Sequence, residues 1–152
     1  MYITRLGKEK LYEEYLSIDD AIVDLNRKMG ESAKIDNDLR ENPEFMELRV
    51  KAMYELPARK KELFNRYKQA IVIEDMEDYI HFDGKTVILG SIVKVQIDGE
   101  IDEYKIVGTD EGNILNNELS CNAPIAQKII GRKIGETIEY NGMSMHIISV
   151  KK

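Results

Sequence analysis

The 152-residue sequence has one cysteine, two histidines and no tryptophan. Because Cys121 is alone, no internal disulfide can form, and we expect it to be a small buried residue and not a nucleophile. His81 and His146 lie far apart and have no partner at the spacing of a metal site or a catalytic triad. These absences argue against thiol chemistry and against a histidine-based catalytic centre.

Long apolar runs are also missing. None approaches the ~20 residues that a membrane-spanning helix needs, and the N-terminal residues MYITRLGKEK contain no apolar core of a secretory signal. With 43% hydrophobic and 33% charged residues, the composition is typical of a protein with much exposed helix surface. We therefore expect one ordinary domain or two small ones, in the cytoplasm and without a membrane partner.

Acidic residues outnumber basic ones, and the net charge is −6. A negative net charge argues against a general DNA-coating protein. The charge is unevenly distributed, however. Residues 31–47 carry six acids and two bases, whereas residues 49–68 carry seven bases and two acids. An acidic segment beside a basic one suits a protein that brings a metal ion to a polyanion. Two solvated helix faces are the plainer interpretation.

Heptad spacing of apolar residues predicts a helical hairpin in the first half of the chain. The buried seam of the first helix is expected to consist of Leu11, Tyr15, Ile18, Ile22, Leu25 and Met29. The seam of the second helix is expected to consist of Phe45, Leu48, Ala52, Leu56, Arg59, Leu63 and Tyr67. Two such helices joined by a short turn form an antiparallel hairpin whose seams bury each other.

Pro57 interrupts the second of these patterns. A proline inside a helix removes one hydrogen bond and clashes with the preceding turn. We expect a bend between Met53 and Pro57 in a helix that continues, with two separate helices as the alternative.

The turn between the two helices is acidic. The stretch NDLRENPEF, residues 37–45, places Asp38, Glu41 and Glu44 beside the turn-forming residues Asn37 and Pro43. If the second helix begins near residue 40, Asp38 and Glu41 can face the same side of the tip. Carboxylate oxygens are the ligands that Mg²⁺ prefers, although two carboxylates alone make a weak site.

The second half of the chain changes to the period of β-strands. Apolar residues alternate in residues 92–97, 104–107, 138–140 and 143–147, and the dipeptides Asp98-Gly99 and Asn141-Gly142 predict hairpin turns. Between them, Pro124 and Gly131 fit the first turn and the end of one short helix. The prediction is an α+β chain with a helical hairpin in residues 1–76 and a small antiparallel sheet with one short helix in residues 77–152.

Three motifs in this order resemble those of the bacterial Gre-type transcript cleavage factors (GreA/GreB). The tip DLRENPEF is similar to GDL-x-EN-x-EY, and GSIVKV followed by EYKIVG forms the second match. The third, LSCNAPIAQKIIGRKIGE, is similar to S-x-x-SPIA-x-x-L-x-G-x-x-x-GD. The resemblance covers nearly the whole chain and implies an N-terminal coiled-coil hairpin followed by an FKBP-like domain.

The resemblance also implies a function as a transcription elongation factor. The FKBP-like domain would dock at the rim of the secondary channel of bacterial RNA polymerase. The hairpin would reach the active centre and the 3′ end of the nascent RNA, where its tip stimulates the polymerase's own cleavage of backtracked RNA. The protein is thus expected to act as a monomer and not to be an enzyme by itself.

The resemblance assigns roles to individual residues of this sequence. Asp38 and Glu41 would be catalytic and would hold Mg²⁺ weakly, with the polymerase supplying the remaining ligands. The other implied roles are support of the tip by Asn42 and Phe45, contact with RNA by Lys34 and Arg49, and docking to the polymerase by Ser120, Asn122 and Pro124.

Each implied role has a plainer alternative. The two tip carboxylates suit any helix N-terminus, and Phe45 is either the last seam residue or a platform for a base. Lys34 and Arg49 also fit simple surface solubility, and the three docking residues also fit helix capping. Glu44 and Glu47 are expected to be solvated acids.

The sequence departs from the family pattern at four positions. Asn37 stands in place of a glycine, Pro43 in place of a small residue, Phe45 in place of a tyrosine and Ala123 in place of a serine. Asparagine tolerates left-handed backbone and proline is compatible with a helix start, so the turn is expected to survive. None of the departures removes a carboxylate.

Two other functions fit a similar shape. Some Gre-shaped proteins enter the same channel and inhibit the polymerase, but this chain keeps the D-x-x-EN spacing of the cleavage-active members. A prolyl isomerase would use an aromatic-lined pocket, for which the second half offers only Tyr79, Phe82, Tyr104 and Tyr140. Isomerase activity is therefore disfavoured.

Overall fold

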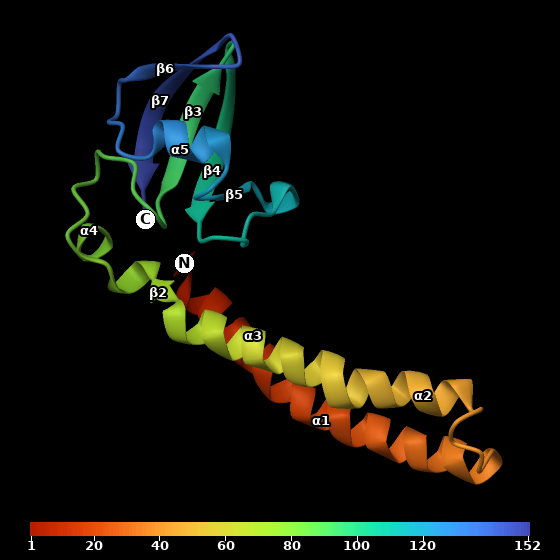
Figure 1. Cartoon of the computed structure of the whole chain (residues 1–152). Coiled ribbons are helices and arrows are strands. Elements are labelled where there is room, and N and C mark those ends of the chain that lie inside the picture. The colour runs from red at the N-terminus through yellow and green to blue at the C-terminus, as the bar shows by residue number, and fades with distance from the viewer. The chain divides into compact units, whose positions relative to one another are not determined.

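The computed structural model describes the whole chain, residues 1–152, and shows a helical hairpin and a sheet domain (Figure 1). The chain forms two compact units. One consists of residues 9–69, and the other combines residues 1–8 with residues 70–152. None of the helices combines the length and the apolar composition that crossing a membrane requires.

The helical unit is an antiparallel hairpin, as the heptad pattern predicts (Figure 1). Helix α1 (Arg5–Ile35) forms the first arm, and α2 (Pro43–Val50), the π-helical segment η1 (Lys51–Glu55) and α3 (Leu56–Gln69) form the second. The most deeply buried apolar seam residues are Leu11, Ile18, Ala52 and Leu63. Because the predicted seam residues are buried or half-buried while most of the remaining surface is exposed, each arm is stabilised mainly by the other.

Aromatic and ionic contacts fix the register of the two arms. The rings of Tyr12 and Tyr67 lie 5.1 Å apart between centroids, and those of Tyr15 and Phe64 lie 5.6 Å apart. Arg59 also reaches across the hairpin, where its Nη2 lies 2.8 Å from Oε1 of Glu14. Exposed ion pairs of this kind contribute little to stability, so packing of the seam dominates.

The helix of the second arm is irregular in the turn that precedes Pro57. Residues Lys51–Glu55 form a π-helical turn in which the N–H of Leu56 donates to the carbonyl of Lys51. Val50 and Leu56 on either side keep right-handed helical backbone angles, so the second arm continues as one helix. Proline has no N–H and its ring crowds the carbonyl four residues earlier, that of Met53, and a wider turn relieves this conflict.

The core of the other unit is a five-stranded sheet with the order β5-β4-β3-β7-β6. Its strands are β3 (Ile92–Ile97), β4 (Glu100–Val107), β5 (Glu118–Ser120), β6 (Thr137–Tyr140) and β7 (Met143–Lys151). Neighbouring strands are antiparallel except for β4 and β5, which are parallel. The fold is therefore α+β as predicted, but the sheet is mixed and not wholly antiparallel, because β5 returns beside β4 through a long loop.

Both predicted hairpin turns are confirmed. Asp98 and Gly99 have φ angles of 50° and 90°, and Asn141 and Gly142 have φ angles of 52° and 78°. Two consecutive positive φ values define the tight turn whose twist matches that of the flanking strands. Asparagine, aspartate and glycine are the residues that adopt this backbone most readily.

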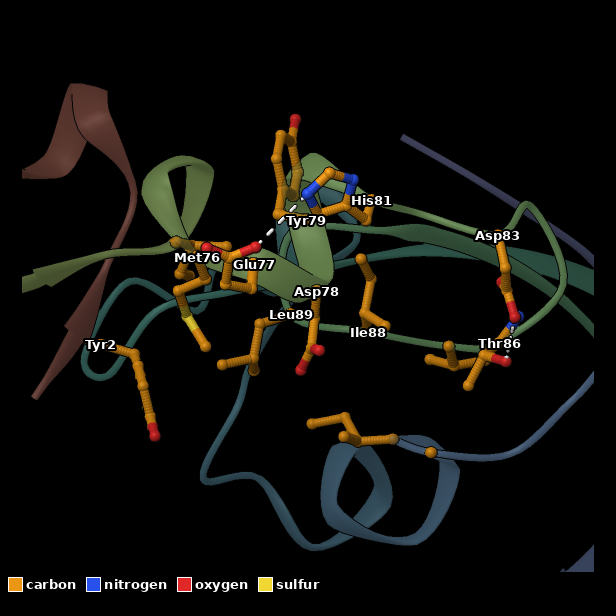
Figure 2. A pocket seen from close by; sticks show the side chains of 14 residues that line it. Tyr2, Met76, Glu77, Asp78, Tyr79, His81, Asp83, Thr86, Ile88 and Leu89 are labelled. Atoms are coloured by element: carbon orange, nitrogen blue, oxygen red, sulfur yellow. Dashed lines mark hydrogen bonds and ion pairs between the residues drawn. The ribbon is translucent and has the colours of Figure 1, made fainter.

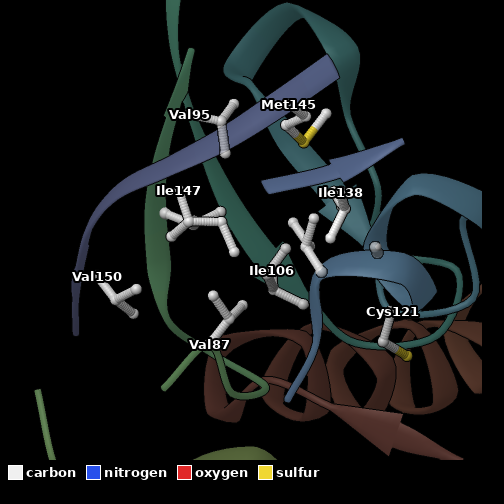
Figure 3. Packing of buried hydrophobic residues seen from close by; sticks show 11 residues of the cluster. Val87, Val95, Ile106, Cys121, Ile138, Met145, Ile147 and Val150 are labelled. Carbon is white, nitrogen blue, oxygen red and sulfur yellow. The ribbon is translucent and has the colours of Figure 1, made fainter. Parts of the chain in front are cut away.

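The hydrophobic core of this unit lies between the sheet and the short helix α5 (Pro124–Ile129) (Figure 3). Strand residues such as Val93, Ile106 and Ile147 are fully buried and meet Ala126 and Ile129 of the helix. Cys121 belongs to the same core, as expected for a small buried residue.

Segments outside the sheet complete the unit. Strand β1 (Tyr2–Ile3) pairs in parallel with β2 (Ile71–Val72), which brings the start of the chain to the segment that follows α3. The segment after β2 contains a 3₁₀ turn, η2 (Ile73–Asp75), and a four-residue helix, α4 (Glu77–Ile80). This additional short helix was not predicted, because its few polar residues have no helical apolar periodicity.

Candidate functional site at the hairpin tip

Asp38 organises the connection between the two arms. Its carbonyl accepts hydrogen bonds from the backbone N–H groups of Glu41 and Asn42, each at 3.0 Å. Its side-chain Oδ1 accepts from the N–H of Arg40 at 3.2 Å, and its own N–H donates to Oδ1 of Asp36 at 3.1 Å. One carboxylate oxygen of Asp38 therefore stabilises the turn that carries it.

The second arm begins later than the sequence suggested. We expected a helix start near residue 40, but α2 starts at Pro43 and its N-cap is Asn42. Asp38 and Glu41 are thus the first and fourth residues of a turn and do not share a helix face. The hydrogen bond between their backbones keeps the two residues within about 7 Å of each other, and both side chains are exposed.

Asn42 connects the ends of both helices. Its Oδ1 accepts from the N–H of Phe45 at 3.0 Å, which caps α2. Its Nδ2 donates to the carbonyls of Ser32 and Asp36, each at 3.2 Å. Asn42 is only 5% exposed and Ser32 only 4%, so these bonds are made out of contact with bulk water. The hydrogen bonds of the buried Asn42 side chain consequently fix the backbone of the tip.

Ser32 is a site residue that the sequence analysis missed. It lies three residues after Met29 and so continues the spacing of the first seam. A heptad pattern of apolar residues does not include Ser32, because its side chain is polar. A polar residue at a seam position, close to a turn-forming asparagine, was the available signal.

The other predicted tip residues differ in their surroundings. Phe45 is half-buried. Lys34 and Arg49 are exposed and form no ion pair within the chain. Glu47 is engaged, since its Oε1 lies 2.6 Å from Nζ of Lys51, and this hydrogen bond lowers the pKa of Glu47. Unpaired basic charge near the tip is therefore carried by Lys34, Arg49 and also Arg40, an exposed residue of the turn whose guanidinium forms no ion pair.

The donor set at the tip is suited to a hard cation but is incomplete. Asp38 and Glu41 offer exposed carboxylate oxygens, which Mg²⁺ prefers. Nowhere in the chain do three or more histidine, cysteine, aspartate or glutamate side chains converge in a way that could hold a metal ion. Two carboxylates leave most of the six positions around magnesium to water or to ligands from another molecule.

The predicted docking residues lie on the turn between β5 and α5. Asn122 and Pro124 are exposed, and Ser120 is half-buried with its Oγ accepting from the N–H of Asn122 at 3.3 Å. The N-cap of α5 is Ala123, which makes no side-chain capping bond. None of the three side chains caps α5 by a hydrogen bond, although Pro124 occupies the first helical turn. Asn122 is exposed, and its Oδ1 lies 3.7 Å from Sγ of Cys121.

A neighbouring loop carries two exposed apolar residues that the sequence analysis missed. Ile114 and Leu115 in the 3₁₀ turn η3 (Ile114–Asn116) are 88% and 95% exposed. The loop lies against the docking turn, because a Cβ built on Gly112 would lie 3.0 Å from the backbone nitrogen of Ser120. An adjacent apolar pair between asparagines was the available signal, and such exposure is a feature of interaction surfaces.

Comparison with known proteins defines the class to which this architecture belongs. The family described as "Transcription elongation factor, GreA/GreB, C-term" matches residues 83–152. The transcription elongation factor GreA of Bacillus cytotoxicus is 32% identical over 158 residues, which cover 98% of this chain and 95% of the relative. The GreA of Thermosipho melanesiensis is 29% identical over 140 residues, which cover 91% of this chain and 86% of the relative.

Among solved structures, that of the GreA factor homolog 1 (Gfh1) protein of Thermus thermophilus spans 100% of this chain and 99% of its own. It has 16% identity and a TM-score of 0.42. On the strength of its sequence relatives, the chain belongs to the GreA/GreB family. It is a Gre-type transcription elongation factor.

Proposed function

We propose that this protein enters the secondary channel of bacterial RNA polymerase and stimulates the polymerase's own cleavage of backtracked RNA. The observation that carries the proposal is the pair of exposed carboxylates, Asp38 and Glu41, in a single turn beyond the last buried residues of the hairpin. A charged pair at this position contributes nothing to the seam. It is instead available to a reaction centre that lies in another molecule.

The chemistry of phosphodiester hydrolysis fits this donor set. Asp38 and Glu41 would hold Mg²⁺ jointly with the polymerase, and the ion would spread the negative charge of the transition state and make a water more nucleophilic. The chain's own contribution is to position the two carboxylates. Because the turn is fixed by hydrogen bonds to Asp38 and Asn42, little backbone freedom remains to be lost when the site is completed.

Unpaired positive charge near the tip supports contact with RNA. Lys34 and Arg49 form no ion pair within the chain, so both are available to phosphate groups of the nascent transcript. Phe45 is only half-buried, and its ring would stack on a base. These three residues would hold the 3′ segment of the RNA while the carboxylates position the metal ion.

The sheet unit would supply the attachment to the polymerase. Asn122 and Pro124 are exposed on the turn before α5, and Ile114 and Leu115 add apolar surface beside them. A polar and conformationally fixed turn next to exposed apolar side chains is a common composition of a protein interface.

Inhibition without cleavage is the second candidate function. One observation favours it, because Oδ1 of Asp38 is already engaged by the N–H of Arg40 and is less available to a metal ion. The second oxygen of Asp38 and both oxygens of Glu41 make no hydrogen bond within the chain, so we place cleavage first.

Addition of the protein to a stalled, backtracked elongation complex distinguishes the two. Cleavage stimulation should shorten the radiolabelled transcript and release a short 3′ fragment, after which added nucleotides allow elongation to resume. Binding to the complex without shortening of the transcript, together with slower elongation, would establish the inhibitor instead. The polymerase alone and the protein with naked RNA serve as controls.

A further inference from the structure

The sheet unit contains a pocket of about 590 Å³ that the proposed function does not use. It lies between the segment of η2 and α4, residues 86–89 and the end of α5 at Ile130 and Gly131 (Figure 2). Its volume is within the range of roughly 300–1,000 Å³ that is common for ligand sites. None of the predicted docking residues Ser120, Asn122 and Pro124 lines the pocket.

The floor of the pocket is apolar. Ile73 and Val87 are fully buried beneath it, and Met76, Ile88 and Leu89 are half-buried. Figure 2 shows Met76 and Leu89 pointing into the same space as the carboxylate of Asp78. The aromatic residues that line the pocket are Tyr2 and Tyr79, whereas Phe82, Tyr104 and Tyr140 do not.

The rim of the pocket is negatively charged, and one of its carboxylates is unpaired. Oε2 of Glu77 lies 3.3 Å from Nε2 of His81, and Asp83 accepts hydrogen bonds from the N–H groups of Lys85 and Thr86 at 2.7 Å each. Asp78 is exposed and makes no hydrogen bond or ion pair in the chain. Neither lysine nor arginine lines the pocket, so the charge of Asp78 is available to a cationic ligand.

A lysine of the chain itself already contacts the same short helix. Nζ of Lys152 donates to the carbonyl of Tyr79 at 2.9 Å and lies 5.0 Å from the centre of the Tyr79 ring. In Figure 2 the ring of Tyr79 points away from the space that Asp78 and Leu89 share, and Lys152 does not line the pocket. Helix α4 thus contacts an ammonium group through the neutral carbonyl and ring of Tyr79, and the unpaired carboxylate of Asp78 adds a negative charge on the same helix.

The pocket is open at Gly131, because a Cβ built on this lining residue would have no atom within 4 Å. We propose that the pocket binds a polypeptide segment of a partner protein in which an arginine or lysine is flanked by large apolar residues. The apolar side chains fill the space over Met76 and Leu89, and the cation pairs with Asp78. This inference does not depend on the proposed function in RNA cleavage.

The test uses the full chain and the acetylated, amidated tripeptide Leu-Arg-Leu as the probe, with Leu-citrulline-Leu as its neutral isostere. Amide chemical shifts in a ¹⁵N-labelled sample should move at Asp78, Leu89 and Gly131. The citrulline peptide should bind about three- to fivefold more weakly, as expected for loss of one partly exposed ion pair. Asp78→Asn should abolish this difference between the peptides.

Glu139→Gln is the matched control, since Glu139 is an exposed carboxylate of β6 outside the pocket and the substitution should leave the difference intact. Shifts confined to other surfaces, or an Asp78→Asn protein that still prefers arginine, would overturn the proposal. Equally tight binding of arginine amide alone would assign the pocket to a small organic cation and overturn the polypeptide ligand. Concentration-dependent shifts at these amides without any peptide would assign it to a second copy of the chain.

Discussion

Asn42 and Ser32, ten residues apart in the chain, form three hydrogen bonds with each other inside the end of the hairpin. Nδ2 of Asn42 donates to the carbonyl and to Oγ of Ser32 at 3.2 and 3.1 Å, and the Ser32 hydroxyl donates to Oδ1 of Asn42 at 3.3 Å. The hydrophobic seam of the hairpin therefore ends in a buried polar pair. This pair fixes where the first helix gives way to the turn that carries Asp38 and Glu41.

Loss of this pair should destabilise the tip. Asn42→Ala removes the N-cap of α2 and leaves the buried Ser32 hydroxyl unpaired, so we expect a loss of about 1–3 kcal/mol in the free energy of unfolding. Chemical denaturation followed by circular dichroism measures it. Asn37→Ala, at an exposed residue of the same turn, is the control and should change stability by less than about 0.5 kcal/mol. Equal stability of the two variants would contradict the assigned role of Asn42.

Local chemistry explains which parts of the fold could be predicted. The heptad seam from Leu11 to Met29 and the dipeptides Asp98-Gly99 and Asn141-Gly142 depend on short-range rules of periodicity and backbone preference, and all three were predicted. The start of α2 was misplaced by three residues, although Asn42 and Pro43 carry the signals of an N-cap and a first helical residue. The local sequence therefore specifies this helix start.

Long-range pairing explains what could not be predicted. The parallel pairing of β5 with β4 joins Lys105 to Glu118 across a loop, and no local pattern specifies it. The pocket depends likewise on side chains from three separate segments. For the site, sequence resemblance identified Asp38 and Glu41, whereas the Ser32–Asn42 pair emerged only when the two helix ends were brought together.

Replacement of Pro57 should stabilise the second arm. An interior proline costs a regular helix ~3 kcal/mol or more, but the π-helical turn Lys51–Glu55 already relieves part of the conflict. Pro57→Ala should therefore raise the free energy of unfolding by roughly 1 kcal/mol, which is less than the full cost of a helical proline. Differential scanning calorimetry should show a higher melting temperature.

Pro43 provides the matched control for this substitution. It occupies the first position of α2, where proline needs no hydrogen-bond partner and its backbone angle is already suitable. Pro43→Ala should accordingly leave the melting temperature unchanged or lower it slightly. If Pro57→Ala also lowered it, the proline would be a stabilising element of the widened turn.

Asp83 should make stability depend on acid pH. Hydrogen bonds from the hydroxyl of Thr86 and from the N–H groups of Thr86 and Lys85 lower its pKa from 3.8 to about 2. A carboxyl group with a lower pKa in the folded state stabilises the protein above pH 3.8, and this contribution is lost as the pH falls towards 2. Titration of the side-chain carboxyl carbon by NMR should give a midpoint near pH 2.

Thr86→Val tests the cause of this shift. The variant keeps the shape of the side chain and removes the hydroxyl, which is the largest contributor to the low pKa of Asp83. Its Asp83 midpoint should rise towards 3.8, whereas Thr137→Val, on strand β6, should leave it unchanged. An unchanged midpoint in Thr86→Val would show that the backbone donors alone hold the carboxylate.

Docking through the turn before α5 predicts a loss of binding without a loss of folding. Asn122→Ala combined with Pro124→Ala should weaken binding to RNA polymerase at least about tenfold, because fixed polar and apolar contacts near an interface centre cost 1–2 kcal/mol or more when removed. Leu115→Ser should weaken it further, since this side chain is 95% exposed and available to a partner. Surface plasmon resonance with immobilised polymerase measures the affinity. A double variant that binds as tightly as the parent protein would remove these residues from the interface.

The carboxylates of the tip should be needed for RNA cleavage and not for folding. Asn can replace Asp38 and still accept the hydrogen bond from Arg40 N–H, so Asp38→Asn removes the charge and keeps the turn. Asp38→Asn and Glu41→Gln should each reduce stimulated cleavage at least about tenfold, because loss of even an outer-shell partner of a metal ligand costs this much. Polymerase affinity and thermal stability should stay close to those of the parent protein. Raised magnesium should partly restore cleavage, since added metal offsets a weakened ligand.

Two further variants separate charge from structure. Glu44→Gln changes an exposed carboxylate in the first turn of α2 and should cleave like the parent protein, which controls for the general acidity of the tip. Asp38→Ala removes both the charge and the acceptor for Arg40 N–H, so it should lose stability as well as cleavage.

The parent protein alone should cleave no RNA, because two carboxylates leave most of the magnesium coordination to water. Should Glu41→Gln cleave at the parent rate while Glu44→Gln does not, the metal-holding role would pass to Glu44. If neither substitution slowed cleavage, the tip would act by occupying the channel.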